Sequence, residues 1–333
     1  MTGGSTPVWV VGAGGLLGAS LWRELDSKAW RSPRALRWSD APRLAEDLAE
    51  AVRAFGTLVR AQASRTWSIA WCAGAGVVGT SAAALEAETR TFERFLALVS
   101  SDSNLRTFSG VISLASSAGG VYGGCLAFPV SEATLPAPIS AYGHAKLAQE
   151  RLLQAWLGEP EHAHVRGLIA RFSNLYGPGQ QLGKAQGLIS HTSRCVIYGA
   201  PIQIYVSLDT IRDYLFADDA ARELARGLRR LAADPAGEPR ALTKVFASER
   251  EVSISALLGV FRQIARRRLR VVVGSQPATS LQPRRLQFRS QVWGAASGRQ
   301  VELIERISRV YQHQLALFAR GVLPPPLPLG SRR

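Results

Sequence analysis

Cysteine and membrane-length hydrophobic segments are both scarce in this chain of 333 residues. Its three cysteines, Cys72, Cys125 and Cys195, cannot all pair with one another and show no CxxC spacing. This pattern argues against a disulfide framework and against a zinc site. Residues 1–7 have neither the basic region nor the hydrophobic core of a secretion signal. We therefore expect a reduced, cytoplasmic protein without a bound metal.

Two segments lack charged residues altogether, 66–85 and 107–131. Each is interrupted by glycine and serine, whereas a membrane-spanning helix needs about 20 consecutive, mostly apolar residues. Buried parallel strands with their connecting loops explain such segments better, because strands covered on both faces are apolar throughout. We expect no membrane partner.

Acidic residues are outnumbered by basic ones, 25 to 40, which gives a net charge of +15 at pH 7. One basic run lies at residues 266–270. A nucleic-acid-binding surface would combine such charge with a binding motif of interleaved aromatic residues, whereas the basic residues here are spread along the whole chain. We expect no nucleic-acid partner. The excess charge indicates either a solvated arginine-rich surface or a surface for an acidic partner.

Strand-like segments alternate along the chain with helical patterns, which is typical of a parallel sheet covered by helices on both faces. A complete sheet of this kind would have another strand between residues 40 and 67, where the pattern is that of one continuous helix. The sequence thus predicts an α/β fold with a Rossmann-type doubly wound parallel sheet whose second βαβ unit is abbreviated. We expect strands at 7–11, 35–38, 68–72, 110–115 and 164–170, and helices at 16–25, 41–62, 81–99, 141–157 and 218–233.

A glycine motif follows the first expected strand, with Gly12, Gly15 and Gly18 at three-residue intervals. Gly12 permits a tight turn, Gly15 lets a pyrophosphate approach the backbone, and Gly18 allows the helix to pack closely on the strand. The phosphates would lie at the helix N-terminus, where unpaired N–H groups favour anions. The motif predicts a dinucleotide-binding site.

Tyr142 and Lys146 lie four residues apart in an expected helix and therefore share one face of it. Free tyrosine has a pKa of about 10, and a neighbouring ammonium group lowers that value because it favours the phenolate. Proton transfer then comes within reach of neutral pH. The serine pair Ser116-Ser117, about one βα unit upstream, would supply a hydroxyl to the same substrate oxygen.

Three further segments complete a recognisable series: SSAGGVYG at 116–123, RFSNLYGPGQ at 171–180 and RDYLFADD at 212–219. With the glycine motif and the Tyr142-Lys146 pair, the chain resembles the extended short-chain dehydrogenase/reductase family, in its nucleotide-sugar epimerase/dehydratase branch. The resemblance covers residues 7 to about 225. It implies a homodimeric enzyme that binds NAD(P) and a nucleotide sugar.

The same resemblance implies a division of the chain into three parts. Residues 1–175 would form the NAD(P)-binding Rossmann domain, to which later strands return. Residues 176–322 would form a smaller C-terminal substrate-binding lobe, and residues 323–333 a flexible tail.

The catalytic residues implied by the resemblance are Ser117, Tyr142 and Lys146. The family's active hydroxyl usually lies four residues before the tyrosine of VYG, a position held here by Ala118. We prefer Ser117, which lies 25 residues before Tyr142, and keep Ser116 and a purely structural serine–glycine loop as alternatives.

The choice of cofactor depends on the end of the second strand, where an acid binds the ribose of NAD and an arginine accommodates the 2′-phosphate of NADP. Arg37 occupies that position, and it can pair with a phosphate bidentately. If the strand ends a few residues later than expected, Asp40 would instead be the acid that binds the ribose of NAD. We therefore favour NADP and keep NAD as the alternative. The expected cofactor-binding residues are Gly12, Gly15, Leu16, Leu17, Gly18, Arg37, Ala73, Gly74, Tyr142, Lys146 and Phe172.

Asn174 and Arg212 match family positions that contact the diphosphate of the substrate. The planar fork of Arg212 suits phosphate oxygens, although a salt bridge to Asp213 or Asp218 is an alternative role, as is loop capping for Asn174. The expected substrate-binding residues are Ser117, Asn174, Gln186 and Arg212, with Lys184 and His191 nearby.

Dehydratases of this branch carry an Asp-Glu pair just after the catalytic hydroxyl, where this chain has Ala118-Gly119-Gly120. Without an acid to protonate a leaving hydroxyl, 4,6-dehydration is not expected. We predict a nucleotide-sugar 4-epimerase or 4-ketoreductase in which hydride moves at the sugar C4 and Tyr142 is the acid/base. The alternative is a regulatory or scaffolding Rossmann protein that binds NAD(P) without turnover.

Overall fold

A computed structural model of the protein describes residues 6–182, 187–233, 237–274, 283–294 and 302–326. Gln186 and Lys184 lie outside the described residues, as does the end of the expected tail, 327–333. No helix in the described ranges is both long and apolar enough to cross a membrane.

One parallel sheet of six strands organises the larger part of the molecule, in the order β10-β5-β4-β3-β1-β2. Both faces of its central strands are covered, because every residue of β1 and β3 is buried. This order confirms the predicted Rossmann-type fold. The strands are β1 (Val8–Val11), β2 (Ala29–Trp30), β3 (Trp67–Trp71), β4 (Gly110–Ser117), β5 (Val165–Phe172) and β10 (Ala241–Phe246).

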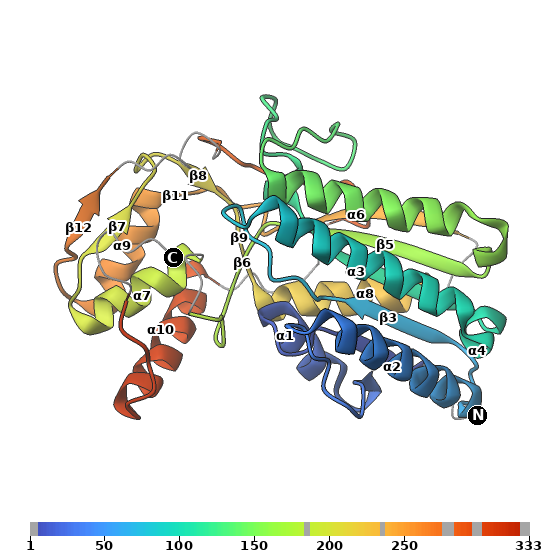
Figure 1. Cartoon of the computed structure of the whole chain (residues 1–333). Coiled ribbons are helices and arrows are strands. Elements are labelled where there is room, and N and C mark those ends of the chain that lie inside the picture. The colour runs from blue at the N-terminus through green and yellow to red at the C-terminus, as the bar shows by residue number, and fades with distance from the viewer. Residues whose placement is uncertain (1–5, 183–186, 234–236, 275–282, 295–301, 327–333) are drawn as a thin grey trace.

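Helices cover the two faces of the sheet, each over its own hydrophobic core (Figure 1). On one face the buried rings of Trp9, Phe55 and Phe95 pack together, with Trp9 centred 5.6 Å from Phe55 and 5.5 Å from Phe95. On the other face Leu21 packs among leucines of α8. The first face carries α2 (Ala41–Ala61), α3 (Ala82–Ser101), α4 (Ser103–Thr107) and α6 (Ala141–Gly158); the second carries α1 (Leu16–Leu25) and α8 (Ala217–Ala233).

The second strand differs from the prediction, because it lies at Ala29–Trp30 and not at residues 35–38. Helix α1 ends at Leu25 as predicted, but the strand follows sooner than expected: Asp26 has φ 49°, and a 3-10 turn, η1 (Asp26–Lys28), returns the chain to the sheet at once. Pro33 follows and has no N–H group to donate to a strand. Helix α2 fills most of the interval between residues 40 and 67, and the described sheet has no strand there. This confirms the predicted abbreviation of the second βαβ unit.

The smaller lobe lies to the left of the sheet in Figure 1 and has its own core, formed by side chains such as Ile189, Leu257, Phe261 and Val310. Its elements are α7 (Leu188–Tyr198), β7 (Ile202–Ile204), α9 (Ile254–Ala265), β12 (Val271–Val273) and α10 (Leu303–Ala319). Short pairs lie between lobe and sheet: β6 (Asn174–Tyr176) with β9 (Tyr214–Phe216), and β8 (Ile211–Arg212) with β11 (Val252–Ser253). The remaining short helices are α5 (Ala118–Val121) and η2 (Pro160–His162).

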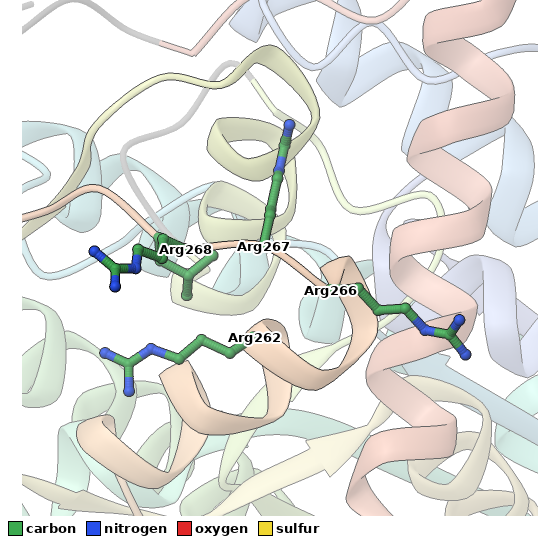
Figure 2. Close-up of a pocket in the computed structure, with 5 residues that line it drawn as sticks. Arg262, Arg266, Arg267 and Arg268 are labelled. Atoms are coloured by element: carbon green, nitrogen blue, oxygen red, sulfur yellow. The ribbon is translucent and has the colours of Figure 1, made fainter.

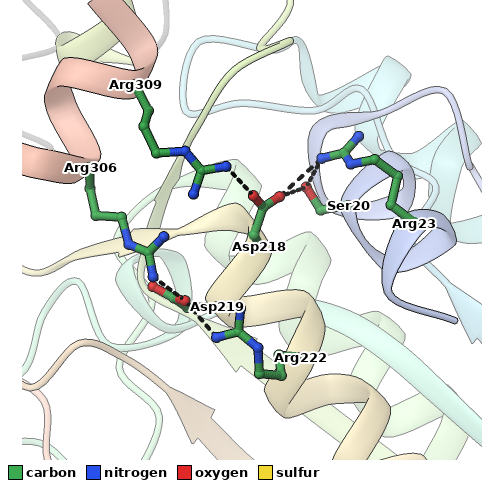
Figure 3. A network of polar contacts seen from close by, with 7 residues as sticks. All are labelled: Ser20, Arg23, Asp218, Asp219, Arg222, Arg306 and Arg309. Atoms are coloured by element: carbon green, nitrogen blue, oxygen red, sulfur yellow. Dashed lines mark hydrogen bonds and ion pairs between the residues drawn. The ribbon is translucent and has the colours of Figure 1, made fainter. Parts of the chain in front are cut away.

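An ion-pair network joins the lobe to the Rossmann domain (Figure 3). Asp218 and Asp219, in the first turn of α8, accept hydrogen bonds at 2.7–3.1 Å from side chains of α1, α8 and α10. The network fixes the start of α8 between the two parts of the molecule. The donors are Ser20, Arg23, Arg222, Arg306 and Arg309.

Candidate active site

The glycine loop connects the carboxyl end of β1 to the N-terminus of α1. Gly12 has φ 86°, and a Cβ atom there would lie 2.7 Å from the Ala73 nitrogen. A Cβ atom on Gly18 would lie 2.2 Å from the Gly12 carbonyl oxygen, so no side chain fits at either position. Helix α1 starts after Gly15, without a side-chain cap and without an acidic residue in its first turn, which contains Leu16 and Leu17. Its N–H groups and positive dipole end can therefore receive an anion.

Ala73 and Gly74 follow β3 and lie beside this loop. A Cβ atom on Gly74 would lie 3.5 Å from the Lys146 Nζ atom and 3.5 Å from the Glu88 Oε2 atom. Gly74 therefore lies between the dinucleotide loop and the candidate catalytic lysine. Glu88 itself is fixed by the Ala75 N–H group, which donates to its Oε1 atom at 2.7 Å.

The three expected catalytic residues come together where β4 ends and α6 begins. Ser117 is the last residue of β4 and caps α5, accepting from the Gly120 N–H group at 3.1 Å; its hydroxyl also lies close enough to Tyr142 to lower the pKa of that phenol. Lys146 lies one turn further along α6, with Nζ 6.0 Å from the centroid of the Tyr142 ring. The buried Lys146 ammonium group donates to the Ala115 carbonyl at 3.4 Å and to Gln149 Oε1 at 3.1 Å. Helix α6 starts here because Ser140 caps it, accepting from the Gly143 N–H group.

Burial controls the protonation of this site. It raises the pKa of Tyr142, while the hydrogen bond from Ser117 lowers that pKa and the Glu88 carboxylate raises it. Burial also lowers the pKa of Lys146, against the opposing charges of Glu88 and Glu150. The fall in the Tyr142 pKa expected from Lys146 is therefore not found; burial gives the shift its direction, because desolvation disfavours the phenolate. The phenol keeps its proton at neutral pH and can donate it.

Ser116, the alternative hydroxyl, points into a different environment. Its hydroxyl donates to the Glu150 carboxylate at 2.5 Å, and Glu150 forms a buried ion pair with Arg171 at 2.6 Å. Arg171 also donates to the hydroxyl of Tyr122. The geometry thus favours Ser117 of the two serines. Sequence reasoning missed this buried cluster, although Arg171 in a strand otherwise made mostly of apolar residues is a signal that could have revealed it.

Arg37 is already engaged by an acidic residue. Its Nε and Nη2 atoms donate to the two carboxylate oxygens of Asp47 at 2.9 and 2.7 Å, and its backbone N–H group donates at 3.0 Å. The hydrogen bond from Arg37 lowers the pKa of Asp47 to about 2. Because β2 ends at Trp30, the residue that follows the strand is Arg31, whose guanidinium lies 5.5 Å from the Trp22 ring centroid. The role of Arg37 in cofactor binding stays a prediction that requires its release from Asp47.

Asp40 and Phe172 have structural partners too. Asp40 is the N-cap of α2 and accepts from the Arg43 N–H group at 3.2 Å. Phe172 ends β5, and its ring packs in the core with its centroid 4.9 Å from that of Phe246. Contact between Phe172 and a cofactor therefore also stays a prediction.

Arg212 is a buried cation with no carboxylate partner among the described residues. Its Nη1 atom donates to the neighbouring Ile211 carbonyl at 2.9 Å, and burial lowers its pKa. The alternative of a salt bridge to Asp213 or Asp218 is wrong: Asp213 accepts from Ser173 at 2.5 Å, and Asp218 belongs to the network of Figure 3. A buried guanidinium of this kind favours an incoming anion.

The other expected substrate-binding residues are Asn174, His191 and Gln186. Asn174 is exposed, and its side-chain amide donates to the Asp213 carbonyl at 2.8 Å, which ties β6 to β9 and does not cap a loop. His191 lies in α7, where burial and the charge of Arg194 lower its pKa. Gln186 is not among the described residues, so its contact with substrate stays a prediction.

One group of possible metal ligands occurs in the described chain, at Glu159, Glu161 and His162. Both ring nitrogens of His162 already have partners, at 2.7 Å from the Trp156 carbonyl oxygen and 2.9 Å from Ser100 Oγ. The imidazole also stacks on Trp156. These contacts explain the histidine as a packed core residue.

The sheet order, the glycine loop and the Ser117–Tyr142–Lys146 geometry define a dinucleotide-binding Rossmann protein of the short-chain dehydrogenase/reductase type. Residues 8–240 match the model of the NAD dependent epimerase/dehydratase family, and the chain belongs to that family. A dTDP-L-rhamnose 4-epimerase of Burkholderia thailandensis is 34% identical over 114 residues, which cover 34% of this chain and 29% of that relative.

Solved structures resemble the chain over almost its whole length. The UDP-glucose 4-epimerase of Thermus thermophilus in complex with NAD has a TM-score of 0.72 at 17% identity, over 92% of this chain and 98% of that one. RMD from Pseudomonas aeruginosa complexed with NADPH has a TM-score of 0.70 at 22% identity, over 93% of this chain and 98% of that one. At these identities the likeness shows the fold.

Proposed function

We propose that the protein is an NAD(P)-dependent nucleotide-sugar 4-epimerase or 4-ketoreductase. The observation that carries this proposal is the convergence of Ser117, Tyr142 and Lys146 beside the glycine loop. The crowded positions Gly12 and Gly18 and the uncapped N-terminus of α1 fit a dinucleotide. A bound nicotinamide would accept or supply the hydride at the sugar C4.

The residues of this chain would handle the proton and the orientation of the substrate. The half-buried phenol of Tyr142 donates its proton to the C4 oxygen in the reducing direction and takes it back in the oxidising direction. Ser117, beside Tyr142, holds the same oxygen in place. Lys146, whose ammonium lies within one helical turn, stabilises the phenolate while it exists.

Arg212 would bind the diphosphate of the sugar nucleotide. Its burial and the lack of a carboxylate partner among the described residues leave its charge to be satisfied by an anion. An arginine fork binds phosphate oxygens bidentately, which gives both attraction and orientation. Asn174 and Gln186 would complete the substrate contacts, and the lobe at 176–322 would cover the sugar.

The absence of an acid at Ala118-Gly119-Gly120, in the helix that follows Ser117, supports epimerisation or reduction over 4,6-dehydration. The matching relatives include 4-epimerases and also a dTDP-glucose 4,6-dehydratase, so this choice rests on the missing acid. For the cofactor we propose NADP or NAD, with Arg37 as the candidate ligand of a 2′-phosphate. Arg37→Ala should weaken NADP binding more than NAD binding; equal dissociation constants before and after the change would remove Arg37 from the site.

The test is turnover by the purified protein with a panel of UDP- and dTDP-hexoses and their 4-keto derivatives, followed by chromatography of the sugar nucleotide. An epimerase interconverts two hexoses without net use of cofactor, whereas a reductase consumes NAD(P)H in proportion to the 4-keto sugar. Tight NAD(P) binding without conversion of any substrate would favour the non-catalytic regulatory protein. The proposed homodimer is tested separately, by light scattering of the same preparation.

A further inference from the structure

Residues 252–301 contain nine arginines and neither aspartate nor glutamate. This acid-free segment supplies a large part of the net charge of +15. Five of the arginines lie within nine residues, at the end of α9 and just before β12: Arg262, Arg266, Arg267, Arg268 and Arg270. We call the surface formed by residues 262–273 the basic α9–β12 surface.

Four of these arginines, with Leu269, line a hollow of about 630 Å³ on the lobe (Figure 2). Figure 2 shows Arg262 and Arg268 extending to the same side, with Arg267 and Arg266 diverging from them. The five arginine side chains are all exposed. Arg266 ends α9 in a left-handed conformation with φ 51°, which turns the chain so that the following arginines face outward.

The arginines of this surface differ from those of the ion-pair network in Figure 3. Arg306 and Arg309 each bind a carboxylate, whereas none of the four in Figure 2 forms an ion pair within the part of the chain that the structure describes. Among the residues that the structure describes, Arg270 donates to the Gly199 carbonyl at 3.5 Å and forms no ion pair. Clustered cations without internal partners create a positive potential that an external polyanion would satisfy.

The basic α9–β12 surface is separate from the proposed substrate site. Val252 of β11 pairs with Arg212 of β8, so the N-terminus of α9 lies next to that site. Helix α9 then continues for 12 residues. At about 1.5 Å per residue its far end lies roughly 18 Å away. The clustered arginines therefore cannot be explained as ligands of the substrate diphosphate.

Apolar side chains extend the surface on its β12 side. Val272 and Val273 are 45% and 59% exposed, directly after Arg270 and Val271. In the described residues β12 pairs with β7 alone. A nucleic-acid surface would add aromatic rings on which bases stack, but residues 262–273 contain no aromatic side chain. Exposed valines beside arginines fit the interface of a bilayer, which takes apolar side chains below a layer of charged headgroups.

We propose that the basic α9–β12 surface binds the anionic phospholipid headgroups of a membrane. The guanidinium groups bind lipid phosphates, and Val272 and Val273 enter the interfacial region. This is peripheral attachment, which needs no membrane-spanning helix, and it departs from the sequence-based expectation of no membrane partner. It holds whether or not the proposed sugar-nucleotide chemistry is correct.

The test is co-sedimentation of the full chain with phosphatidylcholine vesicles and with vesicles that also contain phosphatidylglycerol. Three variants are compared with the parent protein. The first replaces Arg266, Arg267 and Arg268 by glutamate; the second replaces Val272 and Val273 by serine. The third is a charge-matched control that replaces Arg53, Arg60 and Arg94, which are exposed on α2 and α3, by glutamate.

The parent protein should sediment with the anionic vesicles and not with phosphatidylcholine alone. The Arg266/Arg267/Arg268 variant should lose at least about tenfold in partitioning, since each arginine near an anionic surface contributes to binding, whereas the control variant should stay within about twofold. The double valine variant should bind more weakly at high salt, where charge is screened and the apolar contribution remains. Circular dichroism of each variant shows whether the fold is retained.

Three outcomes would overturn the proposal. The first is no binding of the parent protein to anionic vesicles. The second is an equal loss in the cluster and control variants, because the net charge alone would then explain the binding. The third is tighter, cluster-dependent binding to a DNA or RNA oligonucleotide than to the vesicles, which would assign the surface to nucleic acid.

Discussion

Lys146 Nζ lies 6.0 Å from the centroid of the half-buried Tyr142 ring, and the lysine itself is buried beside Gly74. Glu88 completes this arrangement from α3, with its carboxylate also next to Gly74. Burial and the Glu88 carboxylate raise the pKa of the Tyr142 phenol while Ser117 lowers it, and the balance among them decides when Tyr142 gives up its proton.

Glu88→Gln should move the alkaline limb of the pH profile of kcat/KM to lower pH in the reducing direction, where Tyr142 acts as the acid. The Glu88 carboxylate raises the pKa of Tyr142, so its removal lets the phenol ionise at lower pH. The measurement is ketone reduction between about pH 7 and pH 11, with Glu86→Gln as a control, because Glu86 is exposed and pairs with Arg90. A limb that stays in place, or that moves upward, would contradict this role for Glu88.

Replacing each of the two serines at the end of β4 should cause a different defect. Ser117→Ala removes the hydroxyl beside Tyr142 and should lower kcat by at least about tenfold; because Ser117 also caps α5, it should lower the free energy of unfolding by at most about 2 kcal/mol. Ser116→Ala leaves the buried Glu150 carboxylate without one donor and should lower the free energy of unfolding by about 1–3 kcal/mol. Kinetics and urea unfolding of both variants measure this; the reverse pattern would make Ser116 the catalytic hydroxyl.

Arg212→Ala should impair the use of a sugar nucleotide and leave NAD(P) affinity unchanged. Loss of one charge-assisted pair costs about 1.5–3 kcal/mol, which corresponds to roughly a 10- to 150-fold loss in kcat/KM. Arg53→Ala on the exposed face of α2 is the control. Unchanged turnover would remove the diphosphate from the Arg212 site, and loss of the fold would assign Arg212 a structural role.

Asp47 should make the protein less stable in acid. Its folded pKa is about 2, below the unfolded value of about 3.9. The Arg37–Asp47 pair therefore stabilises the fold above about pH 4, and this contribution is lost as the pH falls from about 4 to about 2. Asp47→Asn should lower the unfolding midpoint at pH 7 more than at pH 3. Glu50→Gln, at an exposed pair with Arg34, should have little effect at either pH.

Local patterns were sufficient to predict the fold and much of the candidate site. The glycine spacing and the four-residue interval between Tyr142 and Lys146 are short-range features, and the structure places them as expected. The second strand was misplaced by six residues at its start, because no local pattern in residues 26–38 indicates that a single 3-10 turn leads from α1 straight into β2.

Long-range pairing was beyond the sequence patterns. The partner of Arg37 is on the next helix, and Glu150 and Arg171 come from a helix and a strand that meet only after folding. The isolation of Arg212 from carboxylates in the described chain likewise depends on where Asp213 and Asp218 point. Such contacts follow from tertiary packing, which no local periodicity encodes.

Turnover by Tyr142→Phe tests the central claim most directly. The substitution removes only the hydroxyl that carries the proton, and cofactor binding by the same variant serves as the control for its fold. We expect kcat to fall by roughly 100- to 10,000-fold, with NAD(P) affinity within about threefold of the parent. A variant that keeps its activity within about threefold would contradict the account.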